Sequence, residues 1–169
     1  MHKQPALAVD CVVFDNEGQL LLIRRKNEPF KGQYALPGGF VEFGETTEAA
    51  ARRELYEETR LRVGRFHLVG VYSNPKRDPR GHTISIAYVA VATRGTRARG
   101  GDDAVSAAFV SAWRTLRLAF DHNTIVRDAL KVIAAAWTAT ALTLVGTAPT
   151  AGRSNCISRS EIGSGGGMR

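Results

Sequence analysis

The stretch that decides the fold is "GGFVEFGETTEAAARRELYEETRL", which runs from Gly38 to Leu61. Its first part is rich in glycine and predicts a loop. The segment "TTEAAARRELYEET" (46–59) consists mainly of residues that favour helices. Thr46 can serve as the N-cap residue, and Glu48 suits the positive end of the helix dipole. The stretch therefore predicts a loop that leads directly into a helix.

Three glutamates, Glu54, Glu57 and Glu58, crowd the end of this predicted helix. Residues three and four apart share one helix face, so the carboxylates lie together, at the negative end of the dipole. Each like-charged pair costs the helix roughly 0.2–0.5 kcal/mol, and Arg53, four residues before Glu57, offsets part of that cost. A solvated acidic face would leave the repulsion unexplained. A divalent cation explains it, because magnesium binds carboxylate oxygens and turns repulsion into attraction.

The spacing of these residues resembles the Nudix box, G-x5-E-x7-R-E-U-x-E-E-x-G-U, in which U is apolar. The matching residues are Gly39, Glu45, Arg53, Glu54, Leu55, Glu57, Glu58 and Leu61. Arg60 stands where the pattern has glycine, which commonly ends a helix in the left-handed conformation. We therefore expect a strained or altered turn at Arg60.

The resemblance to the Nudix family implies a hydrolase that uses magnesium or manganese to direct water onto a phosphorus atom of a diphosphate. It assigns the metal ligands to Glu54, Glu57, Glu58 and the carbonyl of Gly39. These three glutamates, together with Arg53, are the expected catalytic residues.

The resemblance also implies that Arg53 orients the carboxylates and that Glu45 pairs with the structure of the box. The general base stays open. Glu57 is one candidate, and the acidic loop residues Asp102 and Asp103 are the others.

Two further stretches indicate the substrate. "YSNPKRDPRGHTISIAYVA" (72–90) resembles the charged loop of a subgroup of ADP-ribose pyrophosphatases, and "LAFDHNTIVRDAL" (118–130) resembles the final helix of that subgroup. Arg77 and Arg80 put two permanent cations in this loop, and a guanidinium binds phosphate through two parallel hydrogen bonds. Asp78 is expected to hold an arginine in place or to accept a hydrogen bond from a ribose hydroxyl.

A third source of positive charge is "LLLIRRK" (20–26), which predicts a strand. Side chains alternate along a strand, so one of Arg24 and Arg25 faces a site while the other faces solvent. The expected substrate-binding residues are therefore Arg24, Arg25, Arg77, Asp78 and Arg80.

The expected reaction is the hydrolysis of ADP-ribose to AMP and ribose 5-phosphate. One alternative keeps the chemistry and replaces the substrate with an oxidised or non-canonical nucleoside triphosphate. Another is a regulator that senses ADP-ribose, which would need a DNA-binding module. The chain after residue 140 is too short and too rich in glycine for such a module.

Apolar runs elsewhere predict strands over residues 6–15, 20–26, 67–73, 83–93 and 105–111. A helix is expected over 122–140, capped by Asp121. The order strands, helix, strands, helix favours a mixed sheet between two helices over a doubly wound sheet. The expected class is α/β, a Nudix-type α/β/α sandwich. The domain is placed at 1–142, followed by a flexible tail rich in glycine and serine at 143–169.

Length, cysteine content, net charge and apolar runs indicate the location and the partners of the protein. The 169 residues suit one domain, and the two cysteines form no disulfide framework, so we expect a reducing, cytoplasmic location. The net charge is +7, but the basic residues are scattered, which argues against nucleic acid as a partner. No run of 18 apolar residues indicates a membrane span. The expected partner is a small nucleotide, and the family resemblance makes a homodimer possible.

Overall fold

A computed structural model of the protein describes residues 4–93, 95–99 and 104–145. Its elements in chain order are β1 (Ala6–Phe14), β2 (Leu20–Arg25), β3 (Tyr34–Ala35), β4 (Gly38–Phe40), α1 (Thr47–Thr59), β5 (His67–Tyr72), β6 (Thr83–Val91), β7 (Ala104–Val110), the 3₁₀ helix η1 (Trp113–Thr115) and α2 (His122–Val145).

The strands form one mixed sheet. Its main path is β3-β2-β1-β6-β5, while β4 pairs with β1 and β7 pairs with β2. β1 and β6 are parallel over their whole length, from the pair Ala6 and Thr83 to the pair Phe14 and Val91. The remaining pairs are antiparallel. The sheet is therefore not the regular parallel sheet of a doubly wound fold.

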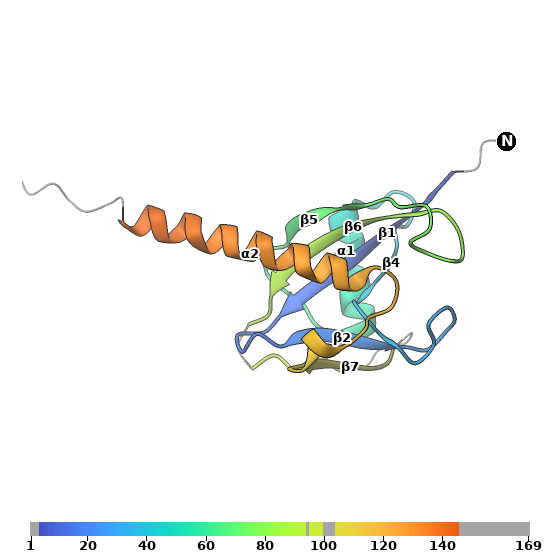
Figure 1. Cartoon of the computed structure of the whole chain (residues 1–169), viewed down its shortest axis with the longest axis horizontal. Coiled ribbons are helices and arrows are strands. Elements are labelled where there is room, and N and C mark those ends of the chain that lie inside the picture. Colours follow the sequence, from blue (N-terminus) through green and yellow to red (C-terminus); the bar gives the residue numbers. More distant parts are fainter. Residues whose placement is uncertain (1–3, 94, 100–103, 146–169) are drawn as a thin grey trace, which may run out of the picture.

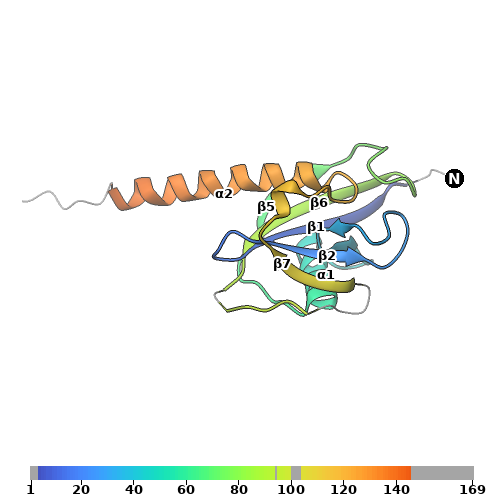
Figure 2. The ribbon, with the colours of Figure 1, turned by 60° about the horizontal axis from the view of Figure 1, so that its bottom comes forward.

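The two helices cover opposite faces of this sheet, α2 above and α1 below in Figure 2. Successive side chains of β1 point to opposite faces of the sheet, so this strand contributes to the interfaces with both helices. Phe14 packs in one buried cluster with Ile125 of α2, whereas Val13 packs in a second cluster with Leu55 of α1. This arrangement confirms the predicted α/β/α sandwich. The C-terminal part of α2 projects past the edge of the sheet (Figure 1).

The sheet opens between β1 and β2. These strands pair at Phe14 and Leu20, next to their turn, and β4 pairs with β1 at the other end, along residues 8–10. Gly38 is needed for this close approach, because a Cβ there would collide with the carbonyl oxygen of Val9. The opening brings the start of the predicted box against the middle of the sheet.

Helix α1 begins and ends as the sequence suggests. The hydroxyl of Thr46 accepts the N–H of Ala49 at 3.2 Å, so the predicted N-cap is confirmed. At the other end, Arg60 has a φ of 58° and donates its N–H to the carbonyl of Tyr56 at 2.8 Å. Of the two outcomes expected at Arg60, the structure shows the strained one, in which an arginine adopts the left-handed conformation that suits glycine.

Helix α2 begins at His122, as predicted, but its end and its cap differ from the prediction. It continues to Val145, so residues 143–145, which we assigned to the tail, are helical, and residues 146–169 lie outside the described part. The carboxylate of Asp121 does not cap the helix but binds Arg77 at 2.6 Å. A buried guanidinium is the stronger partner, because the hydrogen bond is charge-assisted on both sides.

Cys11 is a buried core residue, and its thiol donates to the carbonyl of Ala51 at 3.3 Å. Among the described residues, no helix combines the length and the apolar character that crossing a bilayer requires.

Candidate active site

A cavity of about 240 Å³ lies where α1, the opened strands and the start of α2 meet. It brings together the acidic end of the box helix and the arginines of the charged loop before β6. Its walls are formed by Ala8, Val9, Asp10, Ile23, Arg25, Leu36, Gly38, Gly39, Phe40, Glu54, Glu58, Arg77, Asp78, Arg80, Thr83, Phe120 and His122. Segments far apart in the sequence thus contribute both charges to one site.

Arg53 gathers the acidic side chains of the box. Its guanidinium donates to Glu45 at 2.6 Å, to Glu54 at 2.8 Å and to Glu57 at 3.2 Å. Glu45 also accepts the N–H of Glu42 at 2.8 Å, which fixes the loop before the helix. The hydrogen bonds to Glu45 are the largest of the effects that raise the pKa of Arg53, so this guanidinium stays charged. The geometry agrees with the orienting role that the box pattern implies.

The glycines of β4 shape the wall beside the glutamates. Glu58 is buried and accepts the N–H of Gly38 at 2.9 Å. A Cβ on Gly39 would collide with the carboxylate of Glu54. Gly39 therefore lets a carboxylate and the peptide backbone lie side by side.

The oxygens at this end of the cavity suit a hard divalent cation. Within the described residues, no three acidic, histidine or cysteine side chains already converge on one point. In this structure Arg53 contacts Glu54 and Glu57, and the amide of Gly38 donates to Glu58. All three glutamates occupy neighbouring positions of α1, so they can turn toward a cation that cancels their repulsion. The carboxylates and the carbonyl of Gly39 therefore fit a metal of this class.

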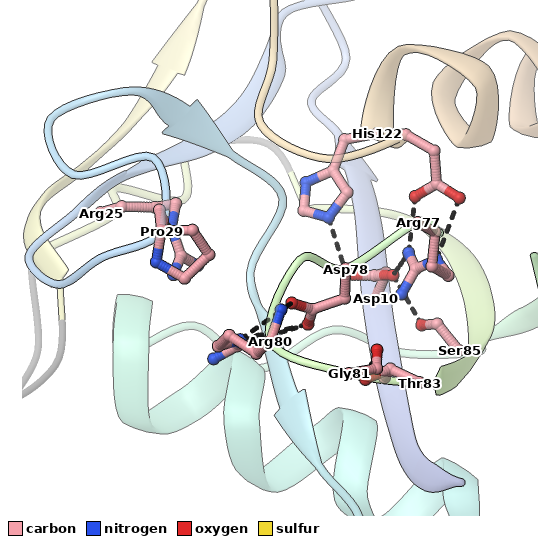
Figure 3. Close-up of polar contacts among 11 residues, drawn as sticks. Asp10, Arg25, Pro29, Arg77, Asp78, Arg80, Gly81, Thr83, Ser85 and His122 are labelled. Carbon is pink, nitrogen blue, oxygen red and sulfur yellow. Dashed lines mark hydrogen bonds and ion pairs between the residues drawn. The ribbon is translucent and has the colours of Figure 1, made fainter. Parts of the chain in front are cut away.

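Two anchored arginines supply the positive wall (Figure 3). Asp78 is only 4% exposed and accepts from Nε and Nη2 of Arg80 at 3.0 and 2.7 Å. Burial alone would raise the pKa of Asp78, but the hydrogen bonds from Arg80 lower it. Arg25 donates its Nε to the carbonyl of Pro29 at 2.7 Å. Burial lowers the pKa of Arg25, and the nearby charge of Arg80 lowers it further.

Arg24 points away from this cavity. Its guanidinium donates to the carbonyl of Gly32 at 2.8 Å and lies 4.4 Å from the centre of the Tyr34 ring. Alternation along β2 thus gives Arg25 to the cavity and Arg24 to the exposed side. Arg24 has no direct access to a ligand bound among the lining residues.

Arg77 is the centre of a buried polar network (Figure 3). Its side chain is 5% exposed and binds Asp121 at 2.6 Å and Asp10 at 3.1 Å. Ser85 donates its hydroxyl to Asp10 at 2.6 Å. Arg77 is among the residues predicted to bind substrate, but its guanidinium is occupied by two carboxylates in the structure. Its direct effect is to hold the loop that carries Arg80.

His122 links this network to the box. Its Nδ1 accepts the N–H of Leu36 at 2.9 Å, so Nε2 carries the hydrogen that faces Asp10, at 3.3 Å. Burial alone would raise the pKa of Asp10, but His122, Arg77 and Ser85 together lower it to about 2. Sequence reasoning missed Asp10, Ser85 and His122. The available signal was Asp10 itself, a lone carboxylate inside the apolar run "VDCVVF".

The remaining candidates for the general base, Asp102 and Asp103, lie outside the described residues. Glu57 is described, and its side chain is 50% exposed. It is therefore accessible to water on the same helix as the other two glutamates.

A family model for the NUDIX domain matches residues 4–134, which include the box, the charged loop and most of α2 that packs on the sheet. The chain belongs to the NUDIX family. The resemblance deduced from Gly39, Glu45, Arg53 and the three glutamates is thereby confirmed. Among curated proteins, an ADP-ribose pyrophosphatase of Methanocaldococcus jannaschii is 48% identical over 131 residues, which cover 78% of this chain and 76% of that protein.

Solved structures of NUDIX proteins resemble this one as well. The NUDIX domain of NrtR from Shewanella oneidensis, complexed with ADP ribose, has a TM-score of 0.72 at 27% identity and covers 78% of this chain and 90% of its own. A bifunctional NMN adenylyltransferase/ADP ribose pyrophosphatase of Francisella tularensis, complexed with AMP and a manganese ion, has a TM-score of 0.68 at 30% identity. That match covers 77% of this chain and 42% of the Francisella protein.

Proposed function

We propose that this NUDIX protein hydrolyses the diphosphate bond of ADP-ribose and releases AMP and ribose 5-phosphate. The observation that carries the proposal is the single cavity that joins the glutamates of α1 to the anchored arginines Arg25 and Arg80. A diphosphate is the chemical group that needs both, because it binds cations through its oxygens and accepts hydrogen bonds from guanidinium groups. The archaeal relative and the two solved structures support the choice of ADP-ribose over other diphosphates.

Glu54 and Glu58 line the proposed catalytic end of the cavity, and Glu57 lies beside them on α1. Glu54, Glu57 and Glu58, with the carbonyl of Gly39, would hold Mg²⁺ or Mn²⁺. The bound cation neutralises phosphate charge and makes a water molecule more acidic. Arg53 keeps two of these carboxylates oriented through its contacts at 2.8 and 3.2 Å. The complex of the Francisella protein with manganese and AMP supports this class of metal.

The arginines form the binding end. Arg80 is held by Asp78, and Arg25 is held by Pro29, so both guanidinium groups keep their direction before the substrate arrives. Such preorganisation lowers the entropy lost on binding. Both groups retain positive charge near the negative diphosphate, and they orient it relative to the carboxylates and the attacking water. Glu57, which is half exposed, is the proposed general base.

The test is a hydrolysis assay of purified protein with ADP-ribose, diadenosine polyphosphates and nucleoside triphosphates, each with and without Mg²⁺. We expect AMP and ribose 5-phosphate from ADP-ribose, and no turnover after chelation with EDTA. Release of pyrophosphate and a nucleoside monophosphate from a triphosphate, with ADP-ribose left intact, would favour the alternative substrate class. Binding of ADP-ribose without hydrolysis would favour a sensor.

A further inference from the structure

Phe120 has an unusual backbone for its residue type. It directly precedes Asp121 and α2, lines the cavity, and has a φ of 53°. A bulky residue in this left-handed region is strained, and such strain persists where the surrounding structure requires the side chain to point in one direction. The contacts of the ring with its neighbours therefore decide where the ring points.

The ring of Phe120 touches both arginines that serve the cavity. The guanidinium carbon of Arg25 lies 4.8 Å from its centre, and that of Arg80 lies 5.7 Å from it. The ring also packs against Phe30 in an edge-to-face arrangement, with ring centroids 4.9 Å apart and an interplanar angle of 72°. The centroid of the His122 ring lies 5.2 Å from that of Phe120. Phe120 is thus held by two rings and is shared by two cations.

This contact solves an electrostatic problem. Arg25 and Arg80 carry the same charge, and burial together with the nearby charge of Arg80 lowers the pKa of Arg25. An aromatic face attracts a cation within about 6 Å of its centre, so one ring can hold both groups near each other in the absence of an anion. Pro29 and Asp78 hold one edge of each guanidinium. Phe120 is the ring within reach of both groups, while Phe40 also lies 5.5 Å from Arg80.

We propose that Phe120 is a positioning residue that holds Arg25 and Arg80 together as one clamp for the diphosphate of a nucleotide. The left-handed backbone is the conformation in which its ring lies against both guanidinium groups. This inference rests on the proposed function, because it assigns the clamp to the same diphosphate. Phe120 itself makes no bond to the reacting atoms.

The test compares Phe120→Leu, which keeps an apolar side chain, with Phe120→Tyr, which keeps the aromatic face. ADP is the binding probe, measured by calorimetry with Mg²⁺ present. The leucine variant should bind ADP about tenfold more weakly, the range that a lost cation–π contact permits. Its KM for ADP-ribose should rise by a similar factor while kcat changes less than about threefold. The tyrosine variant should stay close to the wild type in both measurements.

Phe66→Leu is the matched control. Phe66 is buried, and the guanidinium carbon of Arg52 lies 5.1 Å from the centre of its ring. The substitution therefore removes a comparable cation–π contact outside the cavity. It should leave the affinity for ADP unchanged. If Phe120→Leu fails to fold by thermal unfolding, Phe120→Met takes its place, because methionine fills irregular space more readily.

Equal ADP affinity in the wild type and in the folded leucine or methionine variant would overturn the clamp. A tyrosine variant as weak as the leucine variant would do so too. Failure of the proposed function looks different, since wild-type protein would then leave ADP-ribose intact while the ADP affinities of the variants still report on the clamp.

Discussion

Arg77 donates to the carboxylate of Asp121 at 2.6 Å and thereby ties the charged loop before β6 to the residue that precedes α2. The second carboxylate on this guanidinium, Asp10, comes from the middle of β1. Three segments from different parts of the chain thus meet at one buried cation. These contacts hold the loop that presents Arg80 to the cavity.

Arg77→Met should destabilise the fold. The substitution leaves Asp10 and Asp121 without their buried counter-charge, and removing one partner of a buried ion pair costs about 3 kcal/mol or more. Urea unfolding measures the loss directly. Lys131→Met is the control, since its pair with Asp128 is exposed (72% for the lysine side chain) and should cost less than about 1 kcal/mol. Equal losses in both variants would contradict the buried role of Arg77.

Gly39→Ala should reduce turnover strongly and leave the fold in place. The added Cβ would collide with the carboxylate of Glu54, so this ligand must move away from the metal position. A decrease in kcat of about 100-fold or more is expected, because a small displacement of a catalytic group has a large effect. Gly64→Ala serves as the comparison, as a Cβ there meets nothing within 4 Å. Full activity in the Gly39 variant would show that Glu54 is not a ligand.

Glu57→Gln should lower kcat by orders of magnitude, since the amide neither binds the cation as a carboxylate does nor accepts a proton. Glu48→Gln on the same helix is a matched control. Glu48 is equally exposed at 50% and pairs with Arg52 instead of Arg53. Circular dichroism should show both variants folded. Wild-type turnover by the Glu57 variant would contradict both of its assigned roles.

The stability that Asp10 contributes should be lost in acid. Its pKa is lowered from 3.8 to about 2 in the folded chain, so the unfolded chain binds more protons between these values and stability falls as the pH falls through them. The contribution is present above about pH 4 and amounts to about 2 kcal/mol. Urea unfolding of wild type and Asp10→Asn at pH 6, 4 and 2 measures it. The stability advantage of the wild type should shrink by that amount toward pH 2, and an advantage independent of pH would refute the assignment.

Arg60→Gly should stabilise the protein by about 1 kcal/mol, because glycine adopts the left-handed conformation without the steric cost that arginine incurs. The melting temperature is the readout, and kcat should not change. Arg62→Ala is the reference. Arg62 stacks on the same Tyr56 ring, at 4.4 Å against 5.6 Å for Arg60, so it reports the loss of that contact without relief of backbone strain. A lower melting temperature for Arg60→Gly would mean that the contacts of Arg60 outweigh its backbone strain.

The acidic end of the site could be predicted from the sequence because it lies within one local segment. Glu54, Glu57 and Glu58 share a face of α1 by helix geometry alone. Arg53, from the same 24-residue stretch, contacts Glu54 and Glu57 and pairs with Glu45. The mixed sheet between two helices followed from the order of the elements. Even the end of α1 at Arg60 was placed correctly by the position of the missing glycine.

The other end depended on tertiary structure. Whether Arg77 meets a ligand or two carboxylates is decided by contacts between residues that are 44 and 67 positions apart. Which of Arg24 and Arg25 faces the cavity is decided by how β2 lies in the sheet. Asp10, Ser85 and His122 form a network only because β1 and β6 pair in parallel beside the start of α2. The sequence by itself determined the helix that gathers negative charge, since 3.6 residues per turn fix those neighbours. Only the packing of distant segments decided which positive charges face it, because local periodicity carries no information about partners across the fold.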